Sequence, residues 1–181
     1  GTARILFDFG WIAIDQADWA EGIRLNQASL ALARETGDAL SIYRALTNLG
    51  WTQLCAGQYA AAVPIFDEAL GNARRVGHVR GVAVTLANLA WIAHYQGDTR
   101  QTEALAQESL RLCCQLSEGE LQAECLELLA IAATEKGEAQ RAVQLSAAAE
   151  QLHAALHILR PTTHHATVAH AAALATMRRQ L

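Results

Sequence analysis

Prolines and long apolar runs are scarce in this sequence. The scarcity of proline permits long helices, and the scarcity of long apolar runs excludes a membrane-spanning helix. The 181 residues include two prolines, Pro64 and Pro161, so long stretches remain in which helices can run without interruption. The hydrophobic fraction of 52% is largely alanine and leucine, which favour helix. No apolar run approaches the roughly 20 residues that span a bilayer, and no charged start precedes an apolar signal core. We therefore expect a soluble, cytoplasmic, helical protein.

Basic charge and cysteine are also sparse. Lys136 is the single lysine among 14 basic residues, and the formal net charge is -4, so no strong positive field would draw the chain to nucleic acid or to an anionic membrane. The four cysteines, Cys55, Cys113, Cys114 and Cys125, have neither the spacing of a zinc site nor the density of a small secreted scaffold. We expect free thiols, most of them packed, with no metal and no cofactor.

The sequence repeats itself at a shift of 40 residues. Within each unit the apolar residues recur at steps of three and four, and two breaks carry turn or cap residues. Asp18 with Glu21, and Ser117 with Glu120, have the spacing of a capping box at a helix start. Each unit is therefore predicted to be a helical hairpin. The aligned columns include Gly10, Gly50, Ala90 and Ala130, then Trp11, Trp51, Trp91 and Ile131, and then Ala17, Gly57, Gly97 and Gly137.

Eight helices are predicted within the repeats. They cover residues 2–16, 19–36, 39–56, 59–76, 79–96, 99–116, 119–136 and 139–157. Pro64 lies beyond the first turn of its helix, so it should bend that helix rather than end it. The repeats span residues 1–37, 38–77, 78–117 and 118–157, and a capping helix follows over 162–180. A lone hairpin cannot bury its apolar face, so its neighbours must cover it. Residues 1–181 are therefore predicted to form a single repeat domain.

The second unit carries the clearest motif. Its first helix has Leu49-Gly50, its turn has Gly57-Gln58-Tyr59, and its second helix has Ala62, Phe66 and Ala69-Leu70. This pattern resembles the tetratricopeptide repeat, which implies an all-α fold, a right-handed superhelix (α-solenoid) of four hairpins plus the capping helix. The period of 40, with phrases such as ALARETGD and NLGW, is similar to the repeat region of MalT-like bacterial transcriptional regulators and related signal-transduction ATPases. The chain opens inside a helix without an initiating methionine, so we expect a fragment of a larger protein.

The same resemblance implies that the first helix of each hairpin lines an inner groove. Tryptophan along that groove would offer a large contact area and one N–H donor, which suits a peptide or an amphipathic ligand. The alternative interpretation is that each tryptophan packs between successive first helices as ordinary core. The residues predicted to line the groove are Arg4, Trp11, Asp15, Arg44, Trp51, Leu54, Trp91, His94, Tyr95, Glu124 and Glu127.

Histidine and cysteine patterns give little support to chemistry. His153 and His157 lie four residues apart on one helix face, but zinc would need three or four converging ligands, and solvated or capping histidines fit better. Cys113 and Cys114 are adjacent, so only one of them can face a given side of a helix. No phosphate-binding loop and no combination of nucleophile, base and orienting residue with a known spacing is found. We expect no catalytic residues.

The function predicted is a non-catalytic protein-protein or ligand-binding module, the sensor of a bacterial multidomain transcriptional regulator. Its partner would be a peptide or protein segment, or a small-molecule inducer, in the concave groove. Direct contact with nucleic acid or a membrane is not expected. The alternative is a structural or oligomerisation scaffold, or an adaptor with no small-molecule ligand, that assembles through an exposed terminal hairpin. An enzyme is the third class, and no motif predicts its reaction.

Overall fold

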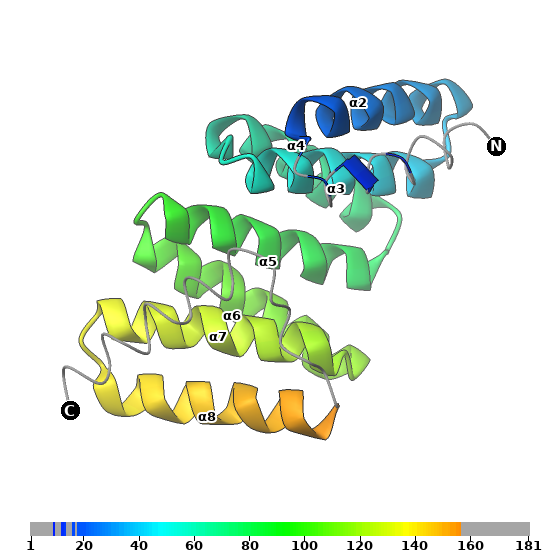
Figure 1. The fold of residues 1–181 in the computed structure, drawn as a ribbon. Coiled ribbons are helices and arrows are strands. Elements are labelled where there is room, and N and C mark those ends of the chain that lie inside the picture. The colour runs from blue at the N-terminus through cyan, green and yellow to red at the C-terminus, as the bar shows by residue number, and fades with distance from the viewer. Residues whose placement is uncertain (1–8, 10–11, 14–15, 17, 157–181) are drawn as a thin grey trace. The chain divides into compact units, whose positions relative to one another are not determined.

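The computed structural model describes residues 18–156 together with Phe9, Ile12, Ala13 and Gln16. Within residues 18–156 the regular structure is helical (Figure 1). The predicted capping helix at 162–180, and most of the predicted helix at 2–16, lie outside the described residues. The helices are α2 (Trp19–Thr36), α3 (Ala39–Cys55), α4 (Tyr59–Arg75), α5 (Val79–Tyr95), α6 (Thr99–Leu116), α7 (Gly119–Glu135) and α8 (Ala139–Ala155).

The helices of the structure follow the period of the sequence, because their first residues are spaced regularly along the chain. Each helix from α2 to α8 begins at its predicted residue and ends within two residues of its predicted end. A left-handed backbone conformation recurs between helices, and glycine adopts it without the strain that a Cβ atom brings. The residues in this conformation are Gly37, Gly57, Gly77, Gly97 and Gly137, with Ser117 taking the place of glycine between α6 and α7.

Aspartate caps the starts of three helices, α2, α3 and α6. The side chains of Asp18, Asp38 and Asp98 each accept a hydrogen bond from the backbone N–H three residues further on, which satisfies one of the free amides of the first turn. The predicted capping boxes are incomplete. Glu21 binds Arg24 through both carboxylate oxygens rather than reaching back to Asp18.

The second predicted box is wrong. Ser117 is the C-cap of α6, and the N-cap of α7 is Glu118, without a side-chain cap bond. The left-handed backbone at Ser117 turns the chain before α7 starts, so this residue cannot serve as the N-cap. Pro64, by contrast, behaves as predicted in one respect, because α4 continues through it from Tyr59 to Arg75.

The chain forms two compact units, Gly1–Thr85 and Leu86–Leu181. In the first unit α3 packs against α4 within its hairpin and against α2 of the preceding one. The ring of Phe66 is fully buried over Gly50, and the Asn26 amide donates to the Thr52 hydroxyl at 3.0 Å. Tyr43 donates to the carbonyl of Gly81 at 3.2 Å, which ties α3 to the start of α5.

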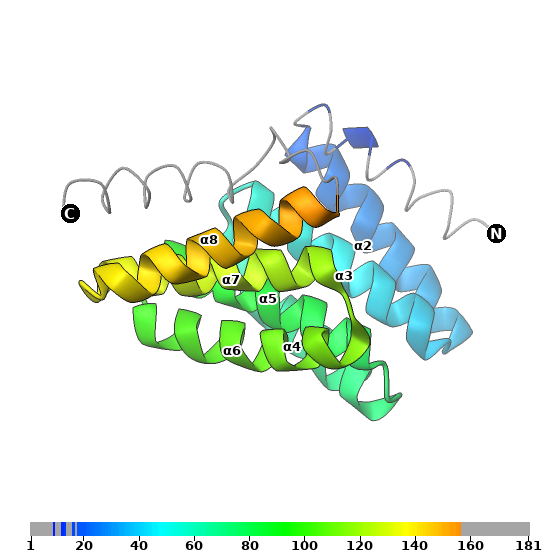
Figure 2. The ribbon, with the colours of Figure 1, turned by 90° about the horizontal axis from the view of Figure 1, so that it is seen from below.

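The second unit repeats this arrangement around α7. Figure 2 shows α7 between α6 and α8, and both pairs are in contact. The core is made of leucine, isoleucine and many alanines, among them Leu128, Ile131 and Ala142, so the helices approach closely. Along residues 18–156, no helix has the length and apolar character that a membrane span requires.

Candidate functional site

The predicted groove residues divide between the two units, and each set is described separately. In the first unit Arg44 is exposed and Trp51 is half-buried. Leu54 is 1% exposed and belongs to the core rather than to an open surface. Burial raises the pKa of the neighbouring Cys55 thiol to about 12, so it stays protonated. Arg4, Trp11 and Asp15 lie outside the described residues.

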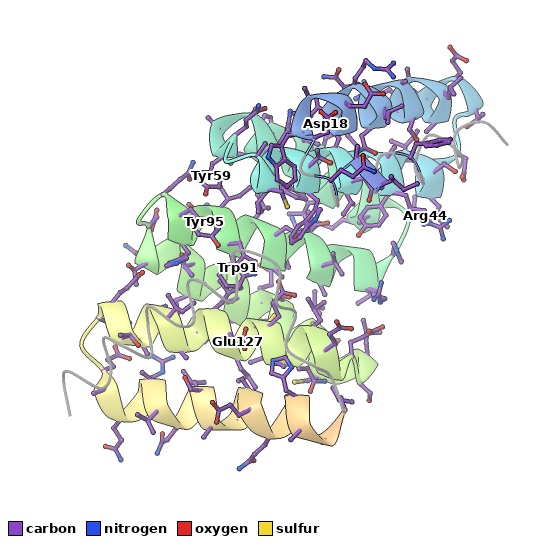
Figure 3. The ribbon with its side chains drawn as sticks, viewed as in Figure 1. Asp18, Arg44, Tyr59, Trp91, Tyr95 and Glu127 are labelled. Carbon is purple, nitrogen blue, oxygen red and sulfur yellow. The ribbon has the colours of Figure 1, made fainter. Side chains whose placement is uncertain are left out.

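In the second unit three aromatic residues gather at the C-terminal end of α5. Trp91 stacks on Tyr95 with ring centroids 6.0 Å apart and an interplanar angle of 23°, and the His94 ring meets Trp91 edge-on at 6.0 Å. Figure 3 shows Trp91 and Tyr95 on α5, with Glu127 on α7. Trp91 is 2% exposed, so it is the buried member of this cluster. His94 and Tyr95 are half-buried and are partly accessible to solvent.

A row of glutamates on α7 faces the aromatic cluster. The Trp91 indole N–H donates to Glu124 Oε1 at 2.6 Å. Burial raises the pKa of the Glu124 carboxyl, the bond from Trp91 opposes that rise, and the charges of Glu127 and Glu120 add to it. The Glu124 carboxyl therefore lies in a partly dry site beside other carboxylates, where a nearby cationic group would favour its charged form.

Two histidines pair with this row of glutamates. Glu127 is 7% exposed, and its Oε1 lies 3.3 Å from Nε2 of His153 on α8. His94 Nδ1 lies 3.1 Å from Glu135 Oε1 at the end of α7. We refer to Trp91, His94, Tyr95, Glu124, Glu127, Glu135 and His153 as the aromatic–acidic cluster. It joins α5, α7 and α8 through polar contacts.

The sequence prediction missed His153 as a member of this cluster. It weighed His153 and His157 as metal ligands and favoured solvated or capping histidines, whereas His153 is half-buried against Glu127. His157 lies outside the described residues, and among those that the structure describes no three histidine, cysteine or carboxylate side chains converge as a metal site. The pairing of His153 with Glu127 depends on how α7 and α8 pack. The period of 40 aligns repeats but does not reveal contacts between two helices of one hairpin.

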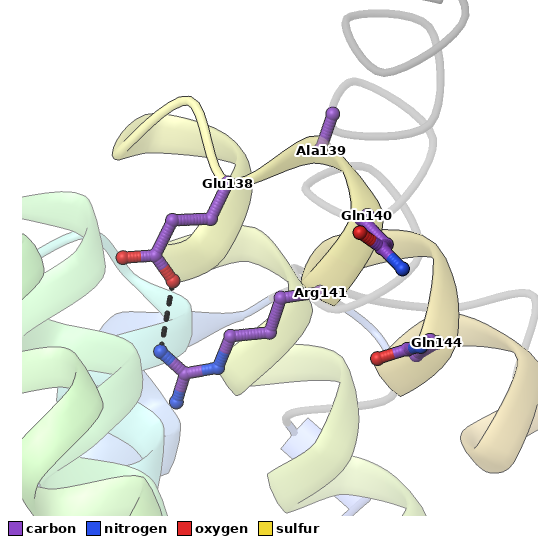
Figure 4. Close-up of a pocket in the computed structure, with 5 residues that line it drawn as sticks. All are labelled: Glu138, Ala139, Gln140, Arg141 and Gln144. Atoms are coloured by element: carbon purple, nitrogen blue, oxygen red, sulfur yellow. Dashed lines mark hydrogen bonds and ion pairs between the residues drawn. The ribbon is translucent and has the colours of Figure 1, made fainter.

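A shallow depression at the start of α8 is a second candidate, lined by Glu138, Ala139, Gln140, Arg141 and Gln144 (Figure 4). Its one cation is already neutralised. Arg141 pairs with Glu138 at 2.8 Å and with Glu103 at 2.8 Å, and Lys136 pairs with the same two carboxylates. This closed network leaves the aromatic–acidic cluster as the better candidate for recognition.

Comparison with known families and structures points to one kind of protein. The family model for the tetratricopeptide repeat matches residues 1–75 and 56–115. No curated protein matches the chain. Because the similar solved structures are under 25% identical to this chain, they bear on the fold alone. They agree with an all-α fold of consecutive hairpins arranged as in a tetratricopeptide-type solenoid.

Three of these solved structures are described by their similarity to the chain. BtubC (BKLC) from P. vanneervenii has a TM-score of 0.75 at 16% identity, covering 90% of this chain and 67% of that one. A Rap protein complexed with competence and sporulation factor has a TM-score of 0.76 at 12% identity, and covers 84% of this chain and 43% of that one. A putative kinesin light chain from Podosopora anserina with nearly identical repeats has a TM-score of 0.73 at 16% identity, covering 99% and 88%.

Proposed function

Since the chain belongs to the tetratricopeptide repeat family, whose members are generally non-catalytic protein-protein interaction modules, we propose that it binds a peptide or protein segment through its first helices. In the second unit the contact surface is the aromatic–acidic cluster. In the first unit it is the exposed face of α3 that carries Arg44 and Trp51. The two faces differ in charge, so they favour different side chains of a partner.

The hydrogen bond between Trp91 and Glu124 is the observation that carries this proposal. It fixes an aromatic platform and a half-buried carboxylate side by side, and the raised pKa of Glu124 reflects a carboxylate that is poorly solvated. A lysine or arginine side chain can neutralise such a group and lie against Tyr95 and His94 through its planar or aliphatic part. The second unit is therefore suited to a segment that carries a cationic residue.

The wider role that we propose is that of a sensing arm in a bacterial multidomain regulator of the MalT-like type, in the cytoplasm. The 40-residue period and the NLGW phrase support it. A related fold in a Rap protein is found in complex with competence and sporulation factor, which supports a repeat of this kind acting as a receptor. The occupant could equally be a small-molecule inducer. Such a ligand shifts a conformational equilibrium only through unequal affinity for its two states.

The binding proposal is tested by selecting displayed random peptides against the chain and measuring the affinity of the enriched peptides by calorimetry. We expect the peptides to contain lysine or arginine. Glu124→Gln should weaken their binding at least about tenfold, equivalent to ~1.4 kcal/mol, because it removes the charge but keeps the acceptor for Trp91. The control is Asp67→Asn, which removes one exposed acidic charge on α4 and should leave the affinity unchanged.

A scaffold or oligomerisation role makes the opposite prediction. Sedimentation velocity would then show concentration-dependent assembly that persists in both Trp51→Ala and Glu124→Gln variants, and peptide selection would enrich nothing that depends on Glu124. Either result would reject the proposed binding role of the cluster. A ligand that binds equally well to Glu124→Gln and to the unaltered chain would also reject it.

A further inference from the structure

Two buried cysteines meet at the contact between α6 and α7, and Cys125 directly follows the groove residue Glu124. Cys113 and Cys125 are each 0% exposed. The Ser109 hydroxyl lies between them, 3.2 Å from the Cys125 sulfur, which donates to it, and 3.8 Å from the Cys113 sulfur. Apolar packing alone would not require two thiols and a hydroxyl to converge in this way. The three groups form a small polar cluster at this helix contact, where the Gln122 amide also donates to the Cys113 carbonyl at 3.0 Å.

We propose that Cys113 and Cys125 are a modification site, a dithiol that closes to a reversible disulfide between α6 and α7 when the protein meets a peroxide. The residues lie on consecutive helices that are in contact, and both sulfurs approach the same Ser109 hydroxyl, which brings the two side chains together. This modification is independent of the proposed partner-binding function. It would act on α7, the helix that also carries Glu124.

The environment assigns a different role to each thiol. Interaction with Cys125, and then with the Ser109 hydroxyl, lowers the pKa of Cys113 against the opposing effects of burial and of the Glu118 and Glu124 charges. The interaction with Cys113, and then burial, raise the pKa of Cys125. Cys113 is therefore the thiol that loses its proton first and the nucleophile of the pair. Cys125 keeps its proton until the second step and then resolves the oxidised sulfur.

The reaction balances with one peroxide per pair. The Cys113 thiolate attacks one oxygen of hydrogen peroxide, the O–O bond breaks, and the departing hydroxide takes up the proton lost by Cys113 and leaves as water. Cys113 is now a sulfenic acid. The Cys125 sulfur then attacks the Cys113 sulfur and the S–O bond breaks. The hydroxyl leaves with the Cys125 proton as a second water, so the two sulfurs lose two electrons and the peroxide gains two.

The other two cysteines, Cys114 and Cys55, provide comparisons for the reactivity of Cys113 towards peroxide. Cys114 is exposed next to Cys113, so it can react at the surface and form bonds between chains. Cys55 is buried, with its pKa raised to about 12, so it should be inert. A small peroxide reaches Cys113 by local opening of the contact between α6 and α7, and its reaction should therefore be slower than that of Cys114.

The experiment uses the full chain and its Cys114→Ser variant, treated with millimolar hydrogen peroxide and measured by intact mass. We expect a loss of about 2 Da in a monomer, reversed by dithiothreitol. Cleavage with a glutamate-specific protease separates the two cysteines, since Glu118, Glu120 and Glu124 lie between them, and should yield one pair of peptides linked by Cys113 and Cys125. The oxidised monomer should melt several degrees higher, because the bond restricts the unfolded chain.

A trapping variant keeps the proposal testable if the disulfide is short-lived. In Cys125→Ser the resolving thiol is gone, so dimedone should label a sulfenic acid at Cys113, and Cys55 should stay unlabelled. Three results would overturn the proposal. These are a folded chain that keeps its reduced mass, oxidation confined to Cys114, and direct conversion of Cys113 to the sulfinic acid with no disulfide.

Discussion

The absence of a side chain at Gly50 allows α3 to lie close to α4. A Cβ atom at Gly50 would lie 2.9 Å from two ring atoms of Phe66, closer than real carbon contacts. The next two repeats have Ala90 and Ala130 in this column, opposite Ala106 and Ser146 in the column of Phe66. The glycine is therefore matched to the aromatic ring of its own hairpin, since smaller partners leave room for alanine.

We expect Gly50→Ala to lower the free energy of unfolding by about 1–3 kcal/mol, because the buried ring of Phe66 must move within a packed core. The matched control is Gly71→Ala in α4, where a Cβ atom would meet nothing within 4 Å. That change should raise the free energy of unfolding by up to about 1 kcal/mol, because alanine favours helix over glycine. Urea denaturation followed by circular dichroism measures both, and effects of the same sign would contradict the argument.

Glu124 gives a prediction about pH. Its raised pKa means that the folded state holds this proton above the usual value of 4.5. Between that value and the folded pKa the folded state binds more protons than the unfolded state, so stability falls as the pH rises through this window. Ionised Glu124 therefore destabilises the fold at neutral pH. A carboxyl group at position 124 thus lowers the stability of the fold, but it provides the acidic group that the proposed binding site needs.

Glu124→Gln should accordingly raise the free energy of unfolding at pH 7, and the gain should disappear below the usual glutamate pKa of 4.5. Glutamine still accepts the Trp91 N–H, so the variant isolates the charge. Asp67→Asn provides a control on the exposed surface of α4, where we expect little difference at either pH. A gain for Glu124→Gln that does not vary with pH would show that charge is not its cause.

At the scale of elements, the capping residues of the helices are where the prediction and the structure differ most. The apolar spacing of three and four fixes the bounds of α2 to α8 closely, since burial of one helix face dominates their stability. Caps depend on single hydrogen bonds and backbone angles, for which the sequence offers competing choices. Ser117 is the better N-cap by residue type, but its left-handed backbone (φ 57°) makes it the C-cap of α6 and leaves Glu118 as the N-cap of α7.

Ser117→Gly should raise the free energy of unfolding by about 0.5–1 kcal/mol, because glycine adopts the left-handed conformation without the penalty of a Cβ atom. The reverse change at the equivalent position, Gly77→Ser (φ 67°), should lower it. No atom lies within 4 Å of a Cβ at residue 77, so backbone strain alone is tested. Thermal denaturation of both variants provides the measurement, and a destabilised Ser117→Gly would disprove the account.

At the scale of the whole molecule, the repeat register predicts which residues share an environment but not how deeply they are covered. Trp51 and Trp91 occupy one column, yet Trp51 is half-buried and Trp91 is 2% exposed. Glu124, 33 residues further along the chain, accepts the N–H of Trp91. Such a contact depends on side-chain packing between helices, which neither periodicity nor propensity encodes.

A chain built of successive hairpins should also respond to substitution locally, because each helix is stabilised by the helices beside it. In hydrogen exchange followed by mass spectrometry, Gly50→Ala should accelerate exchange in α2, α3 and α4 by at least about tenfold, since α3 contacts both α2 and α4. Exchange in α7 and α8 should be unchanged. Glu124→Gln should slow exchange around α7 and leave α2 and α3 as they were. Equal changes in both units from either variant would show that the chain unfolds as one cooperative body, and stability could then no longer be assigned to neighbouring helices.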